Sequence, residues 1–298
     1  MSNYLGIDIG TGSCKAAILD SSGTIHGIGS QSYFSDSQSV HWKEQNPDAI
    51  VDGMIGAVKD VFLKTDQSLL NINAVSLGCA LHGIMAVDKE GNPLTNLYTW
   101  ADDRAERQAR RIKASSDYFE LYRQTGCPAH GMYPLYKIMW IRENLPQVFS
   151  RTAKFISIKE YILQKLCGEF LIDFSVASGS GLFNVHSHQW NPLSLKLAGI
   201  DRQQLSALAS PWMMKSITSP SMAEELGLPL HTPIVLGASD AANSSLGAGA
   251  FSNTQATCMI GTSGAYRIIS PEPLLHPKAS SWCYCVDDSH WLVGGAIN

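Results

Sequence analysis

The chain has 298 residues, which at roughly 150 residues per domain predicts about two domains. Apolar residues make up 45% of it and charged residues 16%, against about 25% charged residues in an ordinary soluble domain, so we expect a large buried core and not a disordered chain. The 22 basic and 26 acidic residues give a net charge of −4, which argues against a nucleic-acid-binding protein and against a polybasic membrane-binding patch.

No apolar stretch approaches the ~20 residues needed to cross a bilayer, and the N-terminus lacks the basic and apolar regions of a secretory signal. We therefore expect a cytoplasmic protein. The seven cysteines are scattered, and Cys283 and Cys285 form a C-x-C pair with no second pair nearby. A zinc site usually takes two such pairs, or one pair with histidine, so we predict buried free thiols and not metal ligands.

Turn residues and apolar periodicity predict strands at the N-terminus, followed by a helix. Two glycine-containing links, residues 10–13 and 20–23, are typical of hairpins and separate three short strands. Asn46 and Pro47 then begin a helix as N-cap and first helical residue, and its apolar residues repeat at intervals of three and four. Strand patterns occupy residues 4–9, 15–19, 24–29, 74–79 and 84–87.

The remaining chain alternates helical and strand patterns. Residues 102–166 are predicted to be mainly helical, with Asp102 and Asp103 at the start of the first helix. A strand at 233–237 leads into a helix of small residues at 240–250. Four more strand patterns follow, at residues 256–260, 266–269, 282–286 and 291–293.

The first hairpin has the composition of an anion-binding loop. Its glycines let successive backbone N–H groups point into one concavity, while hydroxyl and ammonium groups add further donors. The donors expected to hold phosphate are Gly10, Thr11, Gly12, Ser13 and Lys15. Asp8, just before the hairpin, is a candidate ligand for a Mg²⁺ ion that accompanies the phosphates. The alternative is an ordinary hairpin, since the tetrapeptide matches neither G-x-G-x-x-G nor a P-loop.

A second turn of the same chemistry lies further along the chain. Its residues are Gly261, Thr262, Ser263 and Gly264, and two such turns suit a ligand with several phosphates, such as ATP. Before this turn, a strand delivers Asp240 to the start of the small-residue helix. A carboxylate there is either a helix cap, worth about 1 kcal/mol, or a base that accepts the proton of a substrate hydroxyl.

Two further clusters have the composition of a pocket for a polar ligand. Leu81, His82 and Gly83 follow a strand, and Trp100, Asp102 and Arg104 lie at a helix start. A tryptophan offers an apolar face to a sugar, and the other side chains offer partners for hydroxyl and carboxylate groups. The alternatives are a hydrogen-bonded core histidine and a capped helix start.

Together these motifs resemble the FGGY family of carbohydrate kinases, within the actin-like and sugar-kinase ATPase superfamily. The resemblance runs nearly end to end, and the order and spacing of six motifs carry it. The motifs are residues 8–15, 42–47, 81–83, 100–104, 237–240 and 261–264. Two other stretches, residues 125–135 and 155–162, and the Trp-Ala-Asp run at 100–102 are most similar to gluconate kinases.

The resemblance implies an α/β protein with the actin-like, ribonuclease H-like ATPase fold, a mixed β-sheet flanked by helices. It also implies a sugar-binding N-terminal domain over residues 1–250 and an incomplete, nucleotide-binding second domain over 251–298, because family members are considerably longer. We expect such a chain by itself to bind a sugar acid weakly, to bind ATP poorly and to show negligible turnover. A homodimer is a further expectation.

The activity implied by the resemblance is ATP-dependent phosphorylation of a terminal hydroxyl of a sugar or sugar acid, with gluconate as the favoured acceptor. Asp240 would be the base, Asp8 would position Mg²⁺, and the two glycine turns would hold the phosphates. The expected substrate cleft consists of Leu81, His82, Trp100, Asp102 and Arg104. Arg104 is expected to pair with the substrate carboxylate, or alternatively to be a solvated residue on a helix face.

The sequence departs from the family pattern in two of these motifs. Gly12 stands where many relatives carry a hydroxyl residue, which removes one phosphate donor, and Leu81 replaces the more usual methionine. Within the same class, a kinase for a pentulose such as xylulose, or for another open-chain polyol, remains an alternative. From another class, the alternative is a non-catalytic ligand-binding or regulatory module that retains the fold.

Overall fold

The computed structural model describes residues 2–33, 42–260 and 264–297, and its largest sheet has six strands in the order β13-β14-β5-β1-β2-β3. Strand β1 pairs antiparallel with β2 and parallel with β5, so the sheet is mixed. The bounds are β1 (Asn3–Ile9), β2 (Ser13–Asp20), β3 (Ile25–Ser32), β5 (Ile72–Cys79), β13 (Met214–Ser216) and β14 (Pro233–Val235). The predicted N-terminal strands and both hairpin links are confirmed.

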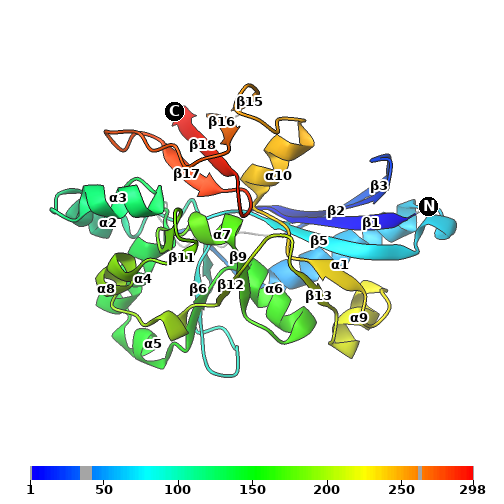
Figure 1. The fold of residues 1–298 in the computed structure, drawn as a ribbon. Coiled ribbons are helices and arrows are strands. Elements are labelled where there is room, and N and C mark those ends of the chain that lie inside the picture. The colour runs from blue at the N-terminus through cyan, green and yellow to red at the C-terminus, as the bar shows by residue number, and fades with distance from the viewer. Residues whose placement is uncertain (1, 34–41, 261–263, 298) are drawn as a thin grey trace.

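Helix α1 (Pro47–Lys64) packs against β2 and β3 of this sheet (Figure 1). It begins where predicted, because the side chain of Asn46 accepts the N–H groups of Asp48 and Ala49, and Pro47 occupies the first helical position. Its buried side chains recur on one face of the helix, at Ile50, Met54, Val58 and Val61. This face meets the alternate buried residues of the strands and forms the core beneath the sheet.

The chain between β5 and β14 forms a mainly helical layer, most of it green in Figure 1. The helices are α2 (Glu106–Lys113), α3 (Tyr118–Thr125), α4 (Pro134–Asn144), α5 (Pro146–Arg151), α6 (Ile158–Cys167), α7 (Phe174–Ser178), α8 (Pro192–Ala198), η2 (Arg202–Gln204) and α9 (Pro220–Leu226). A further 3₁₀ turn, η1 (Gln67–Leu69), lies before β5, between α1 and that strand. The prediction that residues 102–166 are mainly helical is confirmed, with one short strand, β8, inserted among the helices.

Short strands tie the helical layer together in pairs. They are β4 (Glu44–Gln45) with β7 (Leu97–Tyr98), β6 (Met85–Val87) with β8 (Lys154–Ile156), β9 (Leu171–Asp173) with β12 (Ala207–Ala209), and β10 (Phe183–Asn184) with β11 (Gln189–Trp190). The β4–β7 pair matters for the site, because it joins the segment before α1 to the segment before α2.

Helix α10 (Asp240–Gly247) contacts both β5 of the first sheet and β16 of a second, antiparallel sheet of order β15-β16-β18-β17 (Figure 1). The strands are β15 (Ala256–Ile260), β16 (Gly264–Ser270), β17 (Trp282–Cys285) and β18 (Trp291–Ile297). Strand β17 is buried against α7, whereas Ile260 at the end of β15 is 86% exposed. The second sheet is therefore packed at one edge and open at the other.

The structure also tests the predictions about the cysteines and about membrane-spanning segments. All seven cysteines are free thiols and five of them are buried, as predicted. Among the described helices, none is both long and apolar enough to span a bilayer.

Gly29 of β3 tests the packing of α1 on the sheet. A Cβ atom at this position would lie 2.3 Å from the carbonyl oxygen of Ala57 and 2.3 Å from the backbone nitrogen of Val61. Backbone atoms cannot rotate away, so we expect Gly29→Ala to lower the free energy of unfolding by about 1–3 kcal/mol in urea denaturation. Gly247→Ala is the control, because a Cβ there meets nothing within 4 Å. Equal stability of the two variants would contradict the close packing.

Candidate active site

The carboxyl ends of the strands bring Asp8 and Asp240 to one place. Strands β1 and β5 are parallel and stay in register as far as Ile9 and Cys79, so both end at the same edge of the sheet. Cys79 also forms a parallel bridge with Ser239, which sets the start of α10 beside this edge. Crevices outside the carboxyl ends of strands are where α/β sheets usually bind ligands.

Asp240 is held in this crevice by backbone donors. Its carboxylate accepts the N–H of Ala241 at 2.7 Å and also the N–H of Leu81, which follows β5. The N-cap of α10 is Ser239, whose hydroxyl accepts the N–H of Ala242. Ser239 therefore occupies the N-cap position, and Asp240 is the first residue of the helix, where its carboxylate also accepts one N–H of the first turn.

The surroundings of Asp240 tune its acidity. Burial raises its pKa to about 6, and the negative charge of Asp8 acts in the same direction. The positive charge of Arg267 opposes this rise. A carboxylate with this pKa is ionised at neutral pH and is still basic enough to accept a proton from a hydroxyl in a transition state.

Asp8 lies near the end of β1 and is accessible to solvent. It lies opposite Lys15 in β2 and opposite Gly78 in β5. Desolvation raises the pKa of Asp8, and the charge of Lys15 lowers it. A Cβ atom at Gly78 would lie 2.7 Å from Nδ2 of Asn243 and 3.7 Å from Oδ1 of Asp8, so the absence of a side chain at Gly78 lets the amide of Asn243 approach β5 beside Asp8.

The predicted phosphate hairpin has backbone donors to offer. It closes through the N–H of Gly10, which donates to the carbonyl of Ser13 at 3.1 Å. Among the described residues, the N–H groups of Thr11 and Gly12 donate to no acceptor, and a Cβ at Gly12 would meet nothing within 4 Å. The tip of the hairpin is therefore accessible to a ligand.

Side chains from other elements fix the carbonyl side of the hairpin. The hydroxyl of Tyr33 donates to the carbonyl of Gly10, and the amide of Gln45 donates to the carbonyl of Thr11. The indole N–H of Trp100 donates to the Thr11 hydroxyl at 2.9 Å. A small pocket between these groups is also lined by Leu81 and other residues. The predicted phosphate hairpin and the predicted sugar cleft are thus in direct contact.

His82 adopts a backbone φ of +66°, which is uncommon for a residue other than glycine. Its Nδ1–H donates to the carbonyl of Gly179 at 2.6 Å, because a carbonyl can only accept. The ring packs edge-on against Tyr133 and Tyr284, with centroids 5.0 and 5.6 Å away. Burial lowers its pKa to about 3, so the imidazole is neutral and Nε2 is an acceptor.

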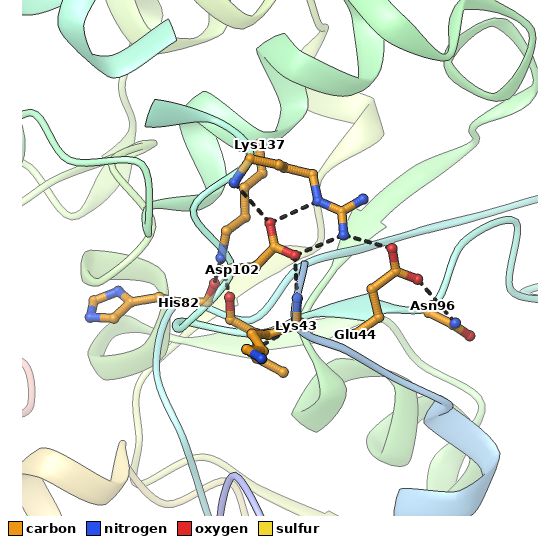
Figure 2. A network of polar contacts seen from close by, with 8 residues as sticks. Lys43, Glu44, His82, Asn96, Asp102 and Lys137 are labelled. Carbon is orange, nitrogen blue, oxygen red and sulfur yellow. Dashed lines mark hydrogen bonds and ion pairs between the residues drawn. The ribbon is translucent and has the colours of Figure 1, made fainter. Parts of the chain in front are cut away.

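Arg104 lies inside a polar network that Figure 2 shows around Asp102 and Glu44. Its Nε and Nη2 donate to the two carboxylate oxygens of Asp102 at 2.7 Å each, and Nη2 also donates to Glu44 at 2.6 Å. Its guanidinium carbon lies 3.8 Å from the ring centroid of Tyr98, and its side chain is 2% exposed. The solvated alternative for Arg104 is therefore wrong, and its main contacts are with the protein itself.

Comparison with known proteins agrees with this geometry. The model of the FGGY family of carbohydrate kinases, N-terminal domain, matches residues 3–247. The chain belongs to the FGGY family of carbohydrate kinases. Gluconokinase from Bacillus subtilis (strain 168) is 37% identical over the whole chain, which spans 58% of that protein. Xylulose kinase from Escherichia coli (strain K12) is 25% identical over 95% of the chain and 57% of that protein.

Solved structures of the FGGY family share the fold. Xylulose kinase from Lactobacillus acidophilus in a ligand-bound form superposes with a TM-score of 0.95 at 32% identity, and gluconate kinase from the same organism superposes with a TM-score of 0.93 at 33% identity. Both comparisons cover 100% of this chain and 60% of the other. The predicted α/β fold and the family resemblance are confirmed, for a chain that spans less than two thirds of these relatives.

Lys137 is a site residue of this FGGY chain that the sequence did not indicate. Its ammonium group is fully buried and donates to the carbonyls of His82 and Thr99, at 3.0 and 2.5 Å (Figure 2). It thereby ties together the two segments of the predicted sugar cleft. Burial lowers its pKa to about 7, against the opposing charge of Asp102. Its place within the first two turns of α4, where its neighbours at residues 134–136 and 138–141 are apolar or aromatic, is the signal that would have identified it.

A buried ion pair supports the start of α10. Nζ of Lys159 lies 2.7 Å from Oδ2 of Asp173 and 3.4 Å from the carbonyl of Ala238. The hydroxyl of Ser175 accepts the N–H of Ser239 at 3.1 Å. These contacts hold the turn that precedes Asp240 in a fixed position.

The second glycine turn remains a prediction. Gly261, Thr262 and Ser263 lie outside the described residues, and Gly264 begins β16.

A pH series on Asp240→Asn tests the burial of Asp240. Folded Asp240 keeps its proton up to about pH 6, whereas the unfolded chain releases it near the ordinary value of 3.8. The native state therefore loses stability as the pH rises from 4 through 6, and asparagine has no such loss. We expect equal melting temperatures at pH 4 and a gain of about 6–12 °C for the variant above pH 6, because a pKa raised from 3.8 to about 6 corresponds to about 3 kcal/mol, and ~1 kcal/mol shifts the melting temperature of a chain of this size by about 2–4 °C. If the difference in melting temperature between wild type and variant is the same at every pH, the pKa of Asp240 is not raised by folding.

Arg104→Gln tests the buried network. The variant leaves the carboxylate of Asp102, which is 0% exposed, without its cation. Breaking a buried pair costs about 3–5 kcal/mol, and we expect a loss of this size in urea unfolding. The control is Arg110→Gln, which removes an ion pair with Glu106 whose arginine is 77% exposed and should change stability by less than about 1 kcal/mol. If both variants lose the same free energy of unfolding, the buried network around Arg104 contributes no more to stability than an exposed ion pair.

Proposed function

We propose that this chain supplies the sugar cleft and the catalytic base of a kinase that phosphorylates a terminal hydroxyl of a sugar acid, with gluconate as the acceptor and 6-phosphogluconate as the product. The observation that carries the proposal is the meeting of Asp240, Asp8 and the hairpin at residues 10–13 at one edge of the sheet. The gluconokinase relative, similar along the whole chain, supports the choice of substrate.

Asp240 acts as the base in this proposal. It accepts the proton of the acceptor hydroxyl while that oxygen forms its bond to the terminal phosphorus and the bond from phosphorus to the leaving oxygen breaks. Its carboxylate is oriented by the N–H of Leu81, and its raised pKa suits the proton transfer. Phosphoryl transfer asks the protein mainly for positioning and charge stabilisation, which this set of groups provides.

The residues around Asp8 fit a phosphate-bound magnesium ion. Among the described residues, no three His, Cys, Asp or Glu side chains gather to hold a metal ion by themselves. Mg²⁺ usually takes one or two carboxylates together with substrate phosphates, and Asp8 offers one carboxylate that is accessible to solvent. The N–H groups of Thr11 and Gly12, with Ser13 and Lys15, would hold the phosphates. Mg-ATP, when bound, supplies the phosphoryl group and neutralises part of its charge.

The cleft residues have separate roles in this proposal. The neutral His82 offers Nε2 as an acceptor for a substrate hydroxyl, and Trp100 offers an apolar face to the carbon chain. Asp102 and Arg104 position the cleft through their mutual contacts, and Arg104 is not the primary partner of the substrate carboxylate.

We propose that the boundary between the sugar-binding and nucleotide-binding parts lies near residue 250, after the end of α10. Free thiols and ATP-dependent chemistry fit a cytoplasmic location.

A second candidate acceptor is xylulose. It is favoured by the xylulose kinase from Lactobacillus acidophilus, whose solved structure has a TM-score of 0.95 and 32% identity to this chain. The two acceptors differ in charge, because gluconate carries a carboxylate and xylulose is neutral. Binding of the two compounds to the same preparation therefore separates the candidates.

Asp240→Asn tests the proposed function. We expect the wild-type chain to bind gluconate more tightly than xylulose in calorimetric titrations, and the variant to retain this binding. Because the chain by itself is expected to show negligible turnover, phosphoryl transfer to gluconate is measured as ADP release from Mg-ATP in a chimera in which this chain replaces the matching part of a full-length gluconokinase. The rate should fall by about 10²–10⁴-fold in the variant, the usual contribution of a general base. Asp201→Asn, at an exposed residue, is the control.

Three outcomes would change the proposal. A full rate in Asp240→Asn would remove Asp240 from the role of base. Tighter binding of xylulose would favour the second candidate. Gluconate binding by the wild-type chimera without any ADP release would favour the non-catalytic binding module.

A further inference from the structure

Arg267 enters the site from the second sheet. It lies in β16, opposite Thr257 of β15 and Gly294 of β18. Its Nη1 donates to the hydroxyl of Ser244 in α10 at 3.1 Å. Ser244 is four residues after Asp240, so both lie on the same face of that helix. The guanidinium is therefore directed to the face of α10 that carries the proposed base.

The guanidinium of Arg267 has donors that the protein does not use. Its Nε is shielded from solvent and has no hydrogen-bond partner. In the part of the chain that the structure describes, no carboxylate lies within ion-pair distance of Arg267, whereas Arg104 has two acidic partners. Buried donors are almost always paired, so an unpaired one calls for an explanation.

The charge of Arg267 acts on both ends of the cleft. Burial raises the pKa of both Asp240 and Tyr284, and the charge of Arg267 opposes the rise at each of them. Tyr284 packs against the ring of His82. The guanidinium therefore lies near the end of the cleft that carries Asp240, here called the reacting end. It is also within electrostatic range of the end that carries His82, here called the sugar end.

We propose that Arg267 is an anion-binding residue of the active site, whose Nε–H and free Nη–H groups donate to an anionic oxygen group of a ligand bound in the cleft. This inference rests on the proposed function. The anionic group is the carboxylate of a sugar acid or the phosphoryl group being transferred, since the planar fork of an arginine matches the paired oxygens of either. The proposal explains the unpaired donor and adds a residue outside the six family motifs.

A purely structural role accounts for less of the geometry. One hydrogen bond to the neutral hydroxyl of Ser244 links β16 to α10, but this link leaves the positive charge without a partner. A structural link predicts that Ser244→Ala and Arg267→Gln have similar effects. An anion site predicts that only the arginine variant loses ligand.

Calorimetric titrations of the full chain with three probes test the inference. The probes are gluconate, glucitol (in which a neutral alcohol replaces the carboxylate) and inorganic phosphate. If the ligand is the carboxylate, Arg267→Gln should weaken gluconate binding by about 10–100-fold, as expected for hydrogen bonds to a charged group, and leave glucitol binding unchanged. If the ligand is the phosphoryl group, phosphate binding should be lost and gluconate binding retained.

Controls and contrary results separate the inference from the proposed function. Ser244→Ala should keep binding of all three probes, and thermal unfolding checks that each variant is folded. If Arg267→Gln does not fold, Arg267→Lys replaces it, because lysine keeps the charge but loses the fork and should still weaken anion binding relative to glucitol. Unchanged binding of both anions overturns the inference and leaves the proposed function intact. Failure of the wild-type chain to bind any probe overturns both.

Discussion

The parallel register between β1 and β5 is the constraint on which the site depends. It ends the two strands at one edge, with Asp8 on the first and Gly78 beside it on the second. The bridge from Cys79 to Ser239 then adds the start of α10 at the same edge. A shift of one residue would turn Asp8 to the opposite face of the sheet, because side chains alternate along a strand. The polar groups of the crevice are therefore fixed by buried apolar strands that have no chemistry of their own.

Three buried cations shape the crevice, and each is fixed by different acceptors. Lys159 pairs with Asp173, Arg104 lies between two carboxylates, and Lys137 has two carbonyl acceptors. Buried pairs add little net stability, because the loss of hydration offsets the attraction between the charges. Their effect here is geometric: they join backbone segments that carry the cleft residues, and they leave those segments few other arrangements.

Local sequence signals predicted the parts of the molecule that depend on local chemistry. The hairpins, the helix cap at Asn46 and the strand-end position of Asp240 follow from turn residues and periodicity, and all are present. The environment of Arg104 was not predictable, because its partner Glu44 is 60 positions away and meets it only through the β4–β7 pair. Lys137 interrupts an apolar run in its helix, which is a weak local signal. Arg267 has no local signal, because the pairing of β16 determines where its side chain points.

The two ends of the cleft differ in how firmly buried contacts hold them in place. At the sugar end, β17 and β18 are fastened to the helical layer: Cys285 donates its N–H to the Ser178 hydroxyl at 2.8 Å, and Trp291 donates its indole N–H to the Val185 carbonyl at 3.0 Å. At the reacting end, Arg267 reaches α10 through a hydroxyl contact, and β15 beyond it is exposed. Local stability follows the density of buried contacts, so the sugar end is the preorganised half. The reacting end holds two carboxylates, Asp8 and Asp240, and two cations, Lys15 opposite Asp8 and Arg267 near Asp240. Among the described residues Arg267 has no acidic partner at ion-pair distance, so its remaining donors are free for an anionic ligand.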